Sequence, residues 1–236
     1  MEDLAHAHCA SKGHCPLSRW ATVGFALLAF ILSVAAAVVA LWITDSSVPS
    51  TIDAISLLVS TPVLVVTLML ASRRFGFSVL AYLGLDIPRR RHIAIAMASL
   101  AAWSILFGML EWALGWNTPP TSMLEIYRSA RSNGSLIWLW LAWVVAAPIG
   151  EEVLFRGFMF RGFVHAQRNA IPSIVLISLV WSLTHVDYEW FTIAEIFVLG
   201  LLLGLVRWST GSTTLTILLH MVQNLVATIW TEFVLG

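Results

Sequence analysis

Long apolar runs separated by short polar segments dominate the chain. A helix needs about 20 mostly apolar residues to cross a bilayer, and the first run, 20–43, contains no charged residue. Six further runs are candidates, and 172–185 is the shortest of them. The seven predicted spans are 20–43, 55–71, 93–114, 136–160, 172–185, 191–206 and 213–235.

Helices are predicted for all of these spans. Lipid offers no hydrogen-bond partners to open backbone groups, and the strands of a membrane barrel would alternate in polarity. Pro148 and Gly150 are expected to interrupt the fourth span, and Pro119 and Pro120 to break up the long loop before it. The pattern therefore predicts an all-α, polytopic membrane protein of about seven transmembrane helices in one bundle.

Three segments differ in their content. Residues 1–19 are expected to form a mobile cytoplasmic tail, 20–135 hold three accessory spans without a motif, and 136–236 hold four spans with candidate catalytic residues. The tail contains Cys9, Cys15 and three histidines. These residues are compatible with a weak metal site, but their irregular spacing favours an unstructured segment.

Composition supports lipid as the main solvent of the chain. Hydrophobic residues make up 59% of it and charged residues only 11%, whereas soluble domains have about 25% charged residues. Membrane lipids are therefore predicted partners. The formal net charge is zero, so the chain lacks the basic surface of a nucleic-acid-binding protein.

The distribution of arginine predicts the orientation in the membrane. Segments after the second, fourth and sixth spans contain arginine. The loops after the first and fifth spans contain acidic residues and no basic residue. Since basic residues favour the cytoplasmic side, the N-terminus is predicted to be cytoplasmic and the C-terminus outside. The loop with Arg128 and Arg131 is an exception that we place outside. The compact size favours the cytoplasmic membrane of a prokaryote.

Ionisable residues inside the spans are candidate functional groups, because a charge at a helix centre costs at least about 2.5 kcal/mol. Glu151 and Glu152 are adjacent in the fourth span. Glu152 and Arg156 are four residues apart, so they can pair on one helix face. Glu151 points about 100° away and is free to act as a base. The alternative for the pair is a salt bridge that anchors the end of the helix.

Two further clusters follow in later spans. Trp181 and His185 lie at the end of the fifth span, and His220 and Asn224 lie one turn apart in the seventh. An imidazole and a carboxamide on one stripe can stabilise an oxyanion. The alternatives are an interfacial histidine at 185 and hydrogen bonds that only hold helices together at 220 and 224.

The sixth span contains two glycines with a predicted packing role and a carboxylate without an assigned role. Gly200 and Gly204 have the small-residue spacing that lets helices pack closely. Glu195 is a buried carboxylate to which the sequence assigns no role. The Glu and His residues could bind zinc, but the chain has no His-Glu-x-x-His helix. We therefore expect a site without metal or other cofactor.

The three clusters, in this order, resemble the CPBP family of CAAX prenyl proteases and bacteriocin-processing enzymes, also called the Abi family. The resemblance covers residues 136–236. It implies that Glu151 and His185 activate water, that His220 and Asn224 form an oxyanion hole, and that Arg156 supports the site by pairing with Glu152. The second motif usually begins with Phe, and Trp181 is expected to keep its packing role.

The resemblance implies an intramembrane endopeptidase, a hydrolase whose partner is a peptide or protein substrate, possibly tethered to the membrane. The alternatives are a non-catalytic immunity or scaffolding protein of the same fold, and a small proton-coupled transporter. The cavity is expected to open to the cytoplasmic side, since Glu151 and His220 both lie toward that side. His185 does not fit, because it lies about 20 Å along its span from that side.

Overall fold

The fold is a bundle of long helices. The computed structural model describes residues 17–164 and 166–235, so the cysteines and histidines of the predicted tail lie outside the described residues. The helices in chain order are α2 (Arg19–Thr44), α3 (Pro49–Arg74), α4 (Val79–Leu83), α5 (Arg90–Leu114), α6 (Thr121–Asn133), α7 (Leu136–Trp140), η1 (Leu141–Ala146), α8 (Ala147–Glu152), η2 (Val153–Met159), α9 (Phe160–Phe163), α10 (Gln167–Ser182), η3 (Leu183–His185), α11 (Trp190–Thr210) and α12 (Thr213–Leu235).

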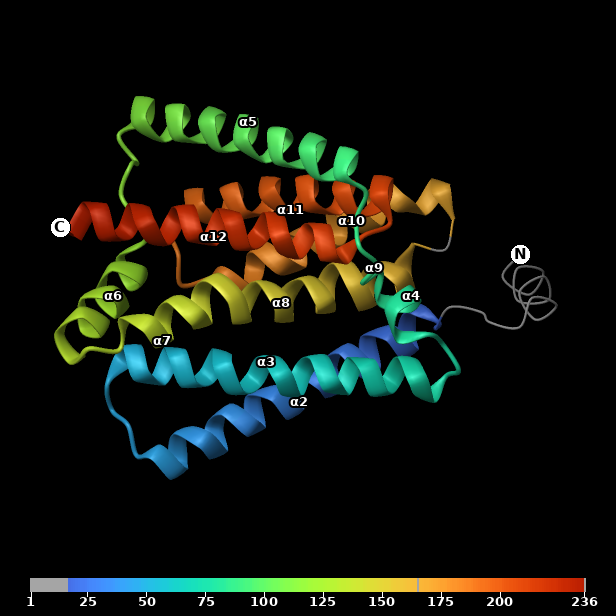
Figure 1. Cartoon of the computed structure of the whole chain (residues 1–236), viewed down its shortest axis with the longest axis horizontal. Helices are drawn as coiled ribbons and strands as arrows, with labels where there is room; N and C mark the ends of the chain where they lie inside the picture. The colour runs from blue at the N-terminus through green and yellow to red at the C-terminus, as the bar shows by residue number, and fades with distance from the viewer. Residues whose placement is uncertain (1–16, 165, 236) are drawn as a thin grey trace.

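Six helices in the described part of the chain are long and apolar enough to cross a membrane: α2, α3, α5, the continuous helix Leu136–Phe163, α11 and α12. The remaining predicted span, the fifth at 172–185, lies largely in α10, which has only 16 residues, or about 24 Å of helix. The long helices lie roughly along one axis. The helix α2 begins at the end of the bundle opposite the end of α12 (Figure 1). The predicted polytopic helical fold is confirmed.

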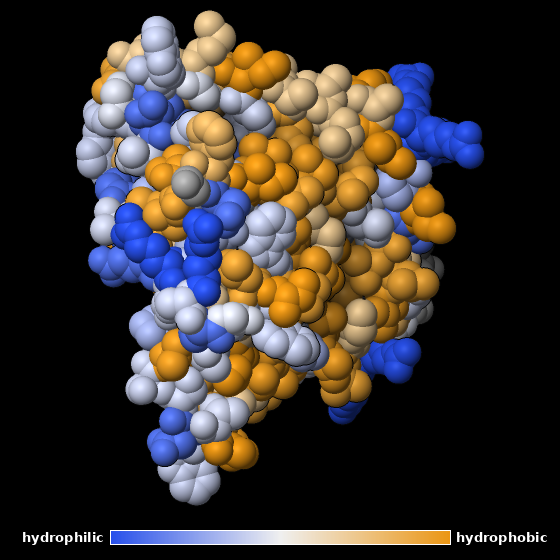
Figure 2. All heavy atoms as spheres, turned by 60° about the vertical axis from the view of Figure 1, so that its left-hand side comes forward, coloured by the Kyte–Doolittle hydropathy of each residue, from blue (hydrophilic) through white to orange (hydrophobic). Residues whose placement is uncertain are grey.

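The outer surface of the bundle is suited to lipid. Large apolar side chains on the outside of α2, such as Ile31 and Val38, are more than half exposed. Figure 2 shows a band of hydrophobic side chains flanked by polar side chains on both sides. A surface of this kind is stable in a bilayer, where apolar side chains contact lipid tails. The chain is therefore an integral membrane protein.

The helix Leu136–Phe163 lies between two hydrophobic cores. Phe155 packs in one core with residues of α5, α10, α11 and α12. Val153 and Phe158 pack in the other core with residues of α2, α3 and α4. We call Leu136–Phe163 the central helix, because it is the element that both cores share.

The predicted interruption of the central helix at Pro148 and Gly150 is wrong. The helix is continuous over 28 residues, but it widens into π-helical turns at η1, before Pro148, and again at η2. The amide of Ala147 bonds to the carbonyl of Ala142, five residues back. Proline lacks the amide that a regular turn requires, and a π turn changes the hydrogen-bond pattern locally without ending the helix.

Side chains from three other helices bond to carbonyl groups of the π-helical turns. The Thr61 hydroxyl of α3 donates to the Ala146 carbonyl at 3.1 Å. The Asn224 amide of α12 donates to the Trp143 carbonyl at 2.8 Å. Arg207 of α11 donates through Nε to the carbonyl of residue 156 at 2.9 Å. These bonds matter because an unsatisfied carbonyl is costly inside a membrane.

The predicted irregular loop after α5 is also wrong in part. Thr121–Asn133 forms the helix α6, which lies across the end of the bundle near the C-terminus (Figure 1). Pro119 and Pro120 do not break this segment but precede the helix. Pro120 is its N-cap, a position from which proline does not disturb the helical hydrogen bonds.

Gly200 and Gly204 pack against α10, as predicted from their spacing. A Cβ atom on Gly200 would lie 2.8 Å from the Ser178 Cβ, and one on Gly204 would lie 2.6 Å from the Ile174 Cγ2. Both distances are shorter than van der Waals contact. The two glycines therefore allow α10 and α11 to approach closely, which brings the end of α10 to the site described below.

We expect Gly204→Leu to destabilise the fold by about 1–3 kcal/mol, the range typical of overpacked interiors. The added side chain would push Ile174 and α10 away from α11. The measurement is the thermal unfolding of the detergent-solubilised protein. Gly24→Leu is the matched control, because a Cβ at Gly24 meets nothing within 4 Å. Equal unfolding temperatures for the two variants would contradict this packing role.

Candidate active site

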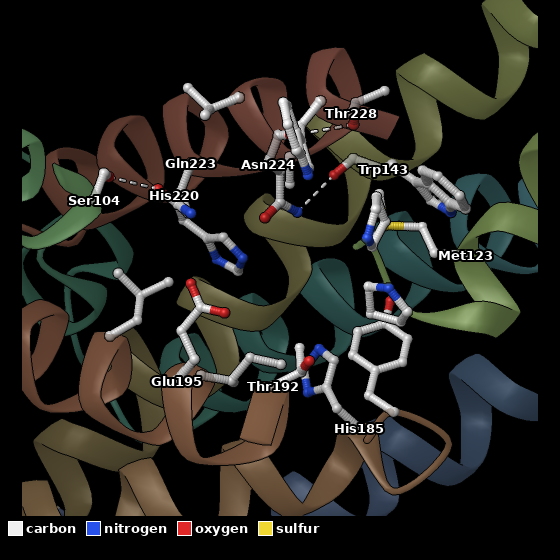
Figure 3. A pocket seen from close by; sticks show the side chains of 18 of the residues that line it. Ser104, Met123, Trp143, His185, Thr192, Glu195, His220, Gln223, Asn224 and Thr228 are labelled. Atoms are coloured by element: carbon white, nitrogen blue, oxygen red, sulfur yellow. Dashed lines mark hydrogen bonds between the residues drawn. The ribbon is translucent and has the colours of Figure 1, made fainter. Parts of the chain in front are cut away.

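A pocket of about 710 Å³ lies between α3, α5, α11, α12 and the central helix. Its lining includes all four predicted catalytic residues, Glu151, His185, His220 and Asn224. Figure 3 shows His220 and Asn224 pointing into the pocket from α12, with His185 on the opposite wall. The fold thus brings residues that are up to 73 positions apart in the sequence to one cavity.

The interior of the site is organised around Glu152. Its side chain is fully buried and accepts a hydrogen bond from Arg156 Nη1 at 2.7 Å, so the predicted pair is confirmed. His220 Nδ1 lies 3.1 Å from the same oxygen, Oε1. The sequence indicated the first contact by its four-residue spacing but not the second, because His220 is 68 residues further along the chain.

The contact with Glu152 determines how His220 faces the pocket. A carboxylate paired with arginine only accepts hydrogen bonds, so His220 Nδ1 carries the proton. The second ring nitrogen, Nε2, is then the atom available to a substrate. With a proton on it, Nε2 donates a hydrogen bond.

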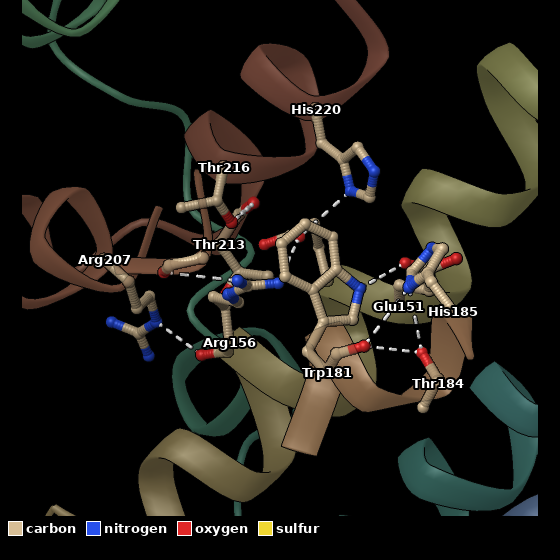
Figure 4. A network of polar contacts seen from close by, with 11 residues as sticks. Glu151, Arg156, Trp181, Thr184, His185, Arg207, Thr213, Thr216 and His220 are labelled. Carbon is tan, nitrogen blue, oxygen red and sulfur yellow. Dashed lines mark hydrogen bonds and ion pairs between the residues drawn. The ribbon is translucent and has the colours of Figure 1, made fainter. Parts of the chain in front are cut away.

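Trp181 contacts the charged groups on both sides of it. Its indole Nε1 donates to Glu151 Oε2, and the guanidinium of Arg156 lies 4.2 Å from its ring centre (Figure 4). His185 and His220 both contact its ring edge to face, at 5.8 and 5.2 Å between centroids. The expected packing role is therefore incomplete, because Trp181 also holds the carboxylate of Glu151. A phenylalanine could not donate this bond.

His185 follows α10 in the short helix η3 and is held by the backbone. Its Nδ1 lies 3.3 Å from the carbonyl oxygen of Trp181. A carbonyl only accepts, so Nδ1 donates and the Nε2 of a neutral His185 is a hydrogen-bond acceptor. Tyr188 stacks beside it at 5.5 Å between centroids. Burial, and then the charge of Asp187, raise the pKa of Tyr188 well above its usual range, so its hydroxyl stays protonated.

Asn224 has one amide hydrogen already committed. Its Nδ2 donates to the carbonyl of Trp143 in the π-helical turn η1, at 2.8 Å. A carboxamide nitrogen has two hydrogens, so one remains for a ligand in the pocket. This bond fixes the orientation of the amide before any substrate binds.

Several polar residues of the pocket were not predicted as site residues. Asp53 of α3 accepts a hydrogen bond from the indole of Trp143. Glu111 of α5 and Glu195 of α11 interact electrostatically with each other and both line the pocket. The available signal was the presence of carboxylates in or beside apolar spans. The sequence could not show that three different helices place them around one cavity.

The expected opening of the cavity is wrong. The pocket extends from Trp181 to the α5–α6 loop, residues 117–120, and to the start of α3 at Asp53. These elements lie at the end of the bundle opposite the start of α2 (Figure 1), whereas the sequence placed the opening at the end with the predicted tail. The depth of His185 is then consistent, because the loop that follows it lies at the open end.

Metal ligands do not gather in the described residues: no group of three or more His, Cys, Asp or Glu side chains there could hold a metal ion. His220 uses Nδ1 for Glu152, and Glu151 uses one oxygen for Trp181. These two candidate metal ligands thus each use one side-chain atom for a hydrogen bond to another residue of the protein.

Comparison with known proteins agrees with this geometry. Residues 133–226 match the family described as type II CAAX prenyl endopeptidase Rce1-like. The predicted family resemblance is confirmed. The Rce1-like region, as we call 133–226, includes Glu151, Trp181, His185, His220 and Asn224. The pocket extends beyond it, because α3 and α5 precede the region and also line the cavity.

The chain is also similar to an Escherichia coli protein named "Uncharacterized 24.3 kDa protein". The two are 37% identical over 79 residues, which is 33% of this chain and 36% of the relative. The match thus spans about a third of the length of that protein. No solved structure matches the chain significantly.

We expect Arg156→Met to destabilise the protein by about 3–5 kcal/mol, because it leaves Glu152 as an unpaired buried charge. Thermal unfolding in detergent is the measurement. Arg131→Met is the matched control, because Arg131 pairs with Glu232 at 3.7 Å and both side chains are about 40% exposed. Exposed pairs contribute at most about 1 kcal/mol. A loss of stability no larger than that of the control would contradict the role of the buried pair.

Proposed function

We propose that the protein is an intramembrane endopeptidase that hydrolyses a peptide bond with a water molecule activated by Glu151. The observation that supports the proposal is the arrangement of the pocket. Glu151 and His185 lie close together at the pocket (Figure 4). His220 and Asn224 offer hydrogen-bond donors from α12, on the side of the pocket opposite His185 (Figure 3). A peptide carbonyl between the two sides would meet both a base and an oxyanion site.

In the first step, Glu151 takes a proton from water while the water oxygen attacks the peptide carbonyl. The indole of Trp181 holds one oxygen of Glu151 and leaves the other available for the water. His185 Nε2 accepts a hydrogen bond from the same water and orients it. Both interactions place the water before reaction, which lowers the entropic part of the barrier.

In the second step, the tetrahedral intermediate has a negative oxygen and must release an amine. Protonated His220 Nε2 and the free amide hydrogen of Asn224 stabilise that oxygen. The carboxylate of Glu152 holds Nδ1 of His220 at 3.1 Å, which leaves Nε2 for the substrate. Glu151 then transfers its proton to the leaving amine. The protein forms no covalent intermediate in this mechanism.

We expect Glu151→Gln and His220→Ala each to lower kcat by at least about 10²-fold, the lower end of general acid–base contributions. The assay follows cleavage of a library of membrane-anchored peptides by mass spectrometry, with the purified full-length protein in proteoliposomes. Glu125→Gln is the control, because Glu125 is exposed on α6 and is not among the residues that line the pocket.

Full activity of Glu151→Gln would overturn the proposal. Activity should also persist with EDTA and phenanthroline, and loss that zinc restores would favour a metalloenzyme instead. A protein of the same fold that only binds its partner would cleave nothing and keep its cellular function in the Glu151→Gln form. The same variant therefore separates the catalytic function from the non-catalytic alternative.

We expect Trp181→Phe to lower kcat by about 10- to 100-fold while KM changes little. The variant keeps the aromatic ring but loses a hydrogen bond to a charged group, worth about 1.5–3 kcal/mol. Trp208→Phe is the control, because it removes an exposed indole bond to Gln167 away from the site. Full kcat in Trp181→Phe would show that the ring alone suffices.

A further inference from the structure

The two ends of the bundle differ in charge. Nine arginines of the described chain lie in or beside the segments at the end where α2 begins: Arg19, Arg73, Arg74, Arg89, Arg90, Arg91, Arg161, Arg168 and Arg207. The other end has Arg128 and Arg131 but also seven acidic residues: Asp45, Asp53, Glu111, Glu125, Asp187, Glu189 and Glu232. Basic residues in short loops mark the cytoplasmic side of a membrane. The arginine-poor end is therefore the outer end.

The pocket belongs to the arginine-poor end. Its lining includes Asp53 at the start of α3, the α5–α6 loop 117–120, Met123 of α6 and Tyr188 before α11. These segments all connect helices at that end (Figure 1). By contrast, the lining includes no residue from the arginine-rich connections 73–91, 161–170 and 207–212. Among the described residues, the inter-helix segments that line the pocket thus all lie at the arginine-poor end.

Tryptophans place this mouth at the membrane interface. Trp112 of α5 and Trp230 of α12 both line the pocket, and 77% and 41% of their surfaces are exposed. Trp116, four residues after Trp112 in the sequence, packs edge to face against Trp190 at the start of α11, with 5.2 Å between ring centroids. Tryptophan is enriched where the bilayer meets water. A substrate held at this mouth would therefore lie beside the outer leaflet.

We propose that the site receives its substrate from the extracytoplasmic side, and that the substrate is a peptide segment next to the outer membrane leaflet of an exported or membrane-anchored protein. The nature of the substrate, a peptide that the protein cleaves, rests on the proposed peptidase function. The direction of access itself rests only on the position of the pocket and on the distribution of arginine and tryptophan.

Cysteine labelling in intact cells tests the direction of access. The chain has two cysteines, Cys9 and Cys15, which are replaced by serine to give a cysteine-free background. Thr118→Cys places a thiol on an exposed position of the pocket rim, and Ser209→Cys places one on an exposed position at the other end. A membrane-impermeant maleimide is added before and after permeabilisation of the inner membrane.

The expected result is labelling of Thr118→Cys in intact cells and of Ser209→Cys only after permeabilisation. The original Cys9 and Cys15, in the full chain without substitutions, should behave like Ser209→Cys, since the tail is predicted to be cytoplasmic. The reverse pattern would overturn the inference. Labelling of both ends in intact cells, or of neither, would overturn it as well.

A second measurement asks whether the cavity itself is open to that side. Ser104 lines the pocket and bonds to Gln223 at 3.1 Å, so Ser104→Cys should react in intact cells with a small impermeant thiosulfonate cation. Ser99→Cys is the control, because Ser99 is exposed on α5 but outside the pocket and should be protected by lipid. Equal reactivity of the two positions would contradict an aqueous opening.

Both measurements require no catalysis, so they separate the two proposals. The labelling pattern should be the same in the Glu151→Gln protein. If peptide cleavage is absent but Thr118→Cys is labelled from outside, the peptidase function fails and the direction of access stands. If cleavage is present but the labelling is reversed, the function stands and the substrate is cytoplasmic.

Discussion

The buried carboxylate of Glu152 is the constraint on which the rest of the site depends. It is fully enclosed, so it requires charged or polar partners that are equally buried. Arg156 supplies the opposite charge from the next turn of the central helix, and His220 supplies a second bond from α12. Arg156 also bonds to the Gly200 carbonyl of α11 at 3.3 Å. The central helix, α11 and α12 are thus held in one register by this one ion pair.

The shape of the central helix meets a second requirement, that backbone groups stay paired inside a membrane. The π-helical turns around Pro148 and Glu152 leave carbonyls that accept bonds from Thr61, Asn224 and Arg207. Asn224 is the residue with two functions here. One amide hydrogen of Asn224 is donated to a backbone carbonyl of the central helix, and the other remains for the pocket. The irregular helix and the proposed oxyanion site therefore depend on each other.

The asymmetry of the bundle then decides what the pocket can contact. Close packing at Gly200 and Gly204 brings α10 against α11, and α10 ends at the site instead of continuing to the membrane surface. The short 3₁₀ turn η3 that follows places His185 beside Tyr188 and the loop before α11. The cavity extends to the arginine-poor end, where carboxylates, an amide and tryptophans surround it. A substrate of the proposed peptidase would meet this end of the protein first.

The sequence alone predicted the helical membrane fold and the four candidate catalytic residues that the structure brings to one pocket. Long apolar runs have one stable structure in lipid, and ionisable residues at that depth are costly enough to be noticed individually. Local spacing also determined that Glu152 pairs with Arg156. Only the tertiary structure decided that His220 bonds to Glu152, that Trp181 holds Glu151, and that the cavity opens away from the start of α2. These contacts join helices separated by tens of residues, and no local period encodes them. The direction of the opening depends on where helices begin and end in space, so distances counted along single spans placed it at the wrong end.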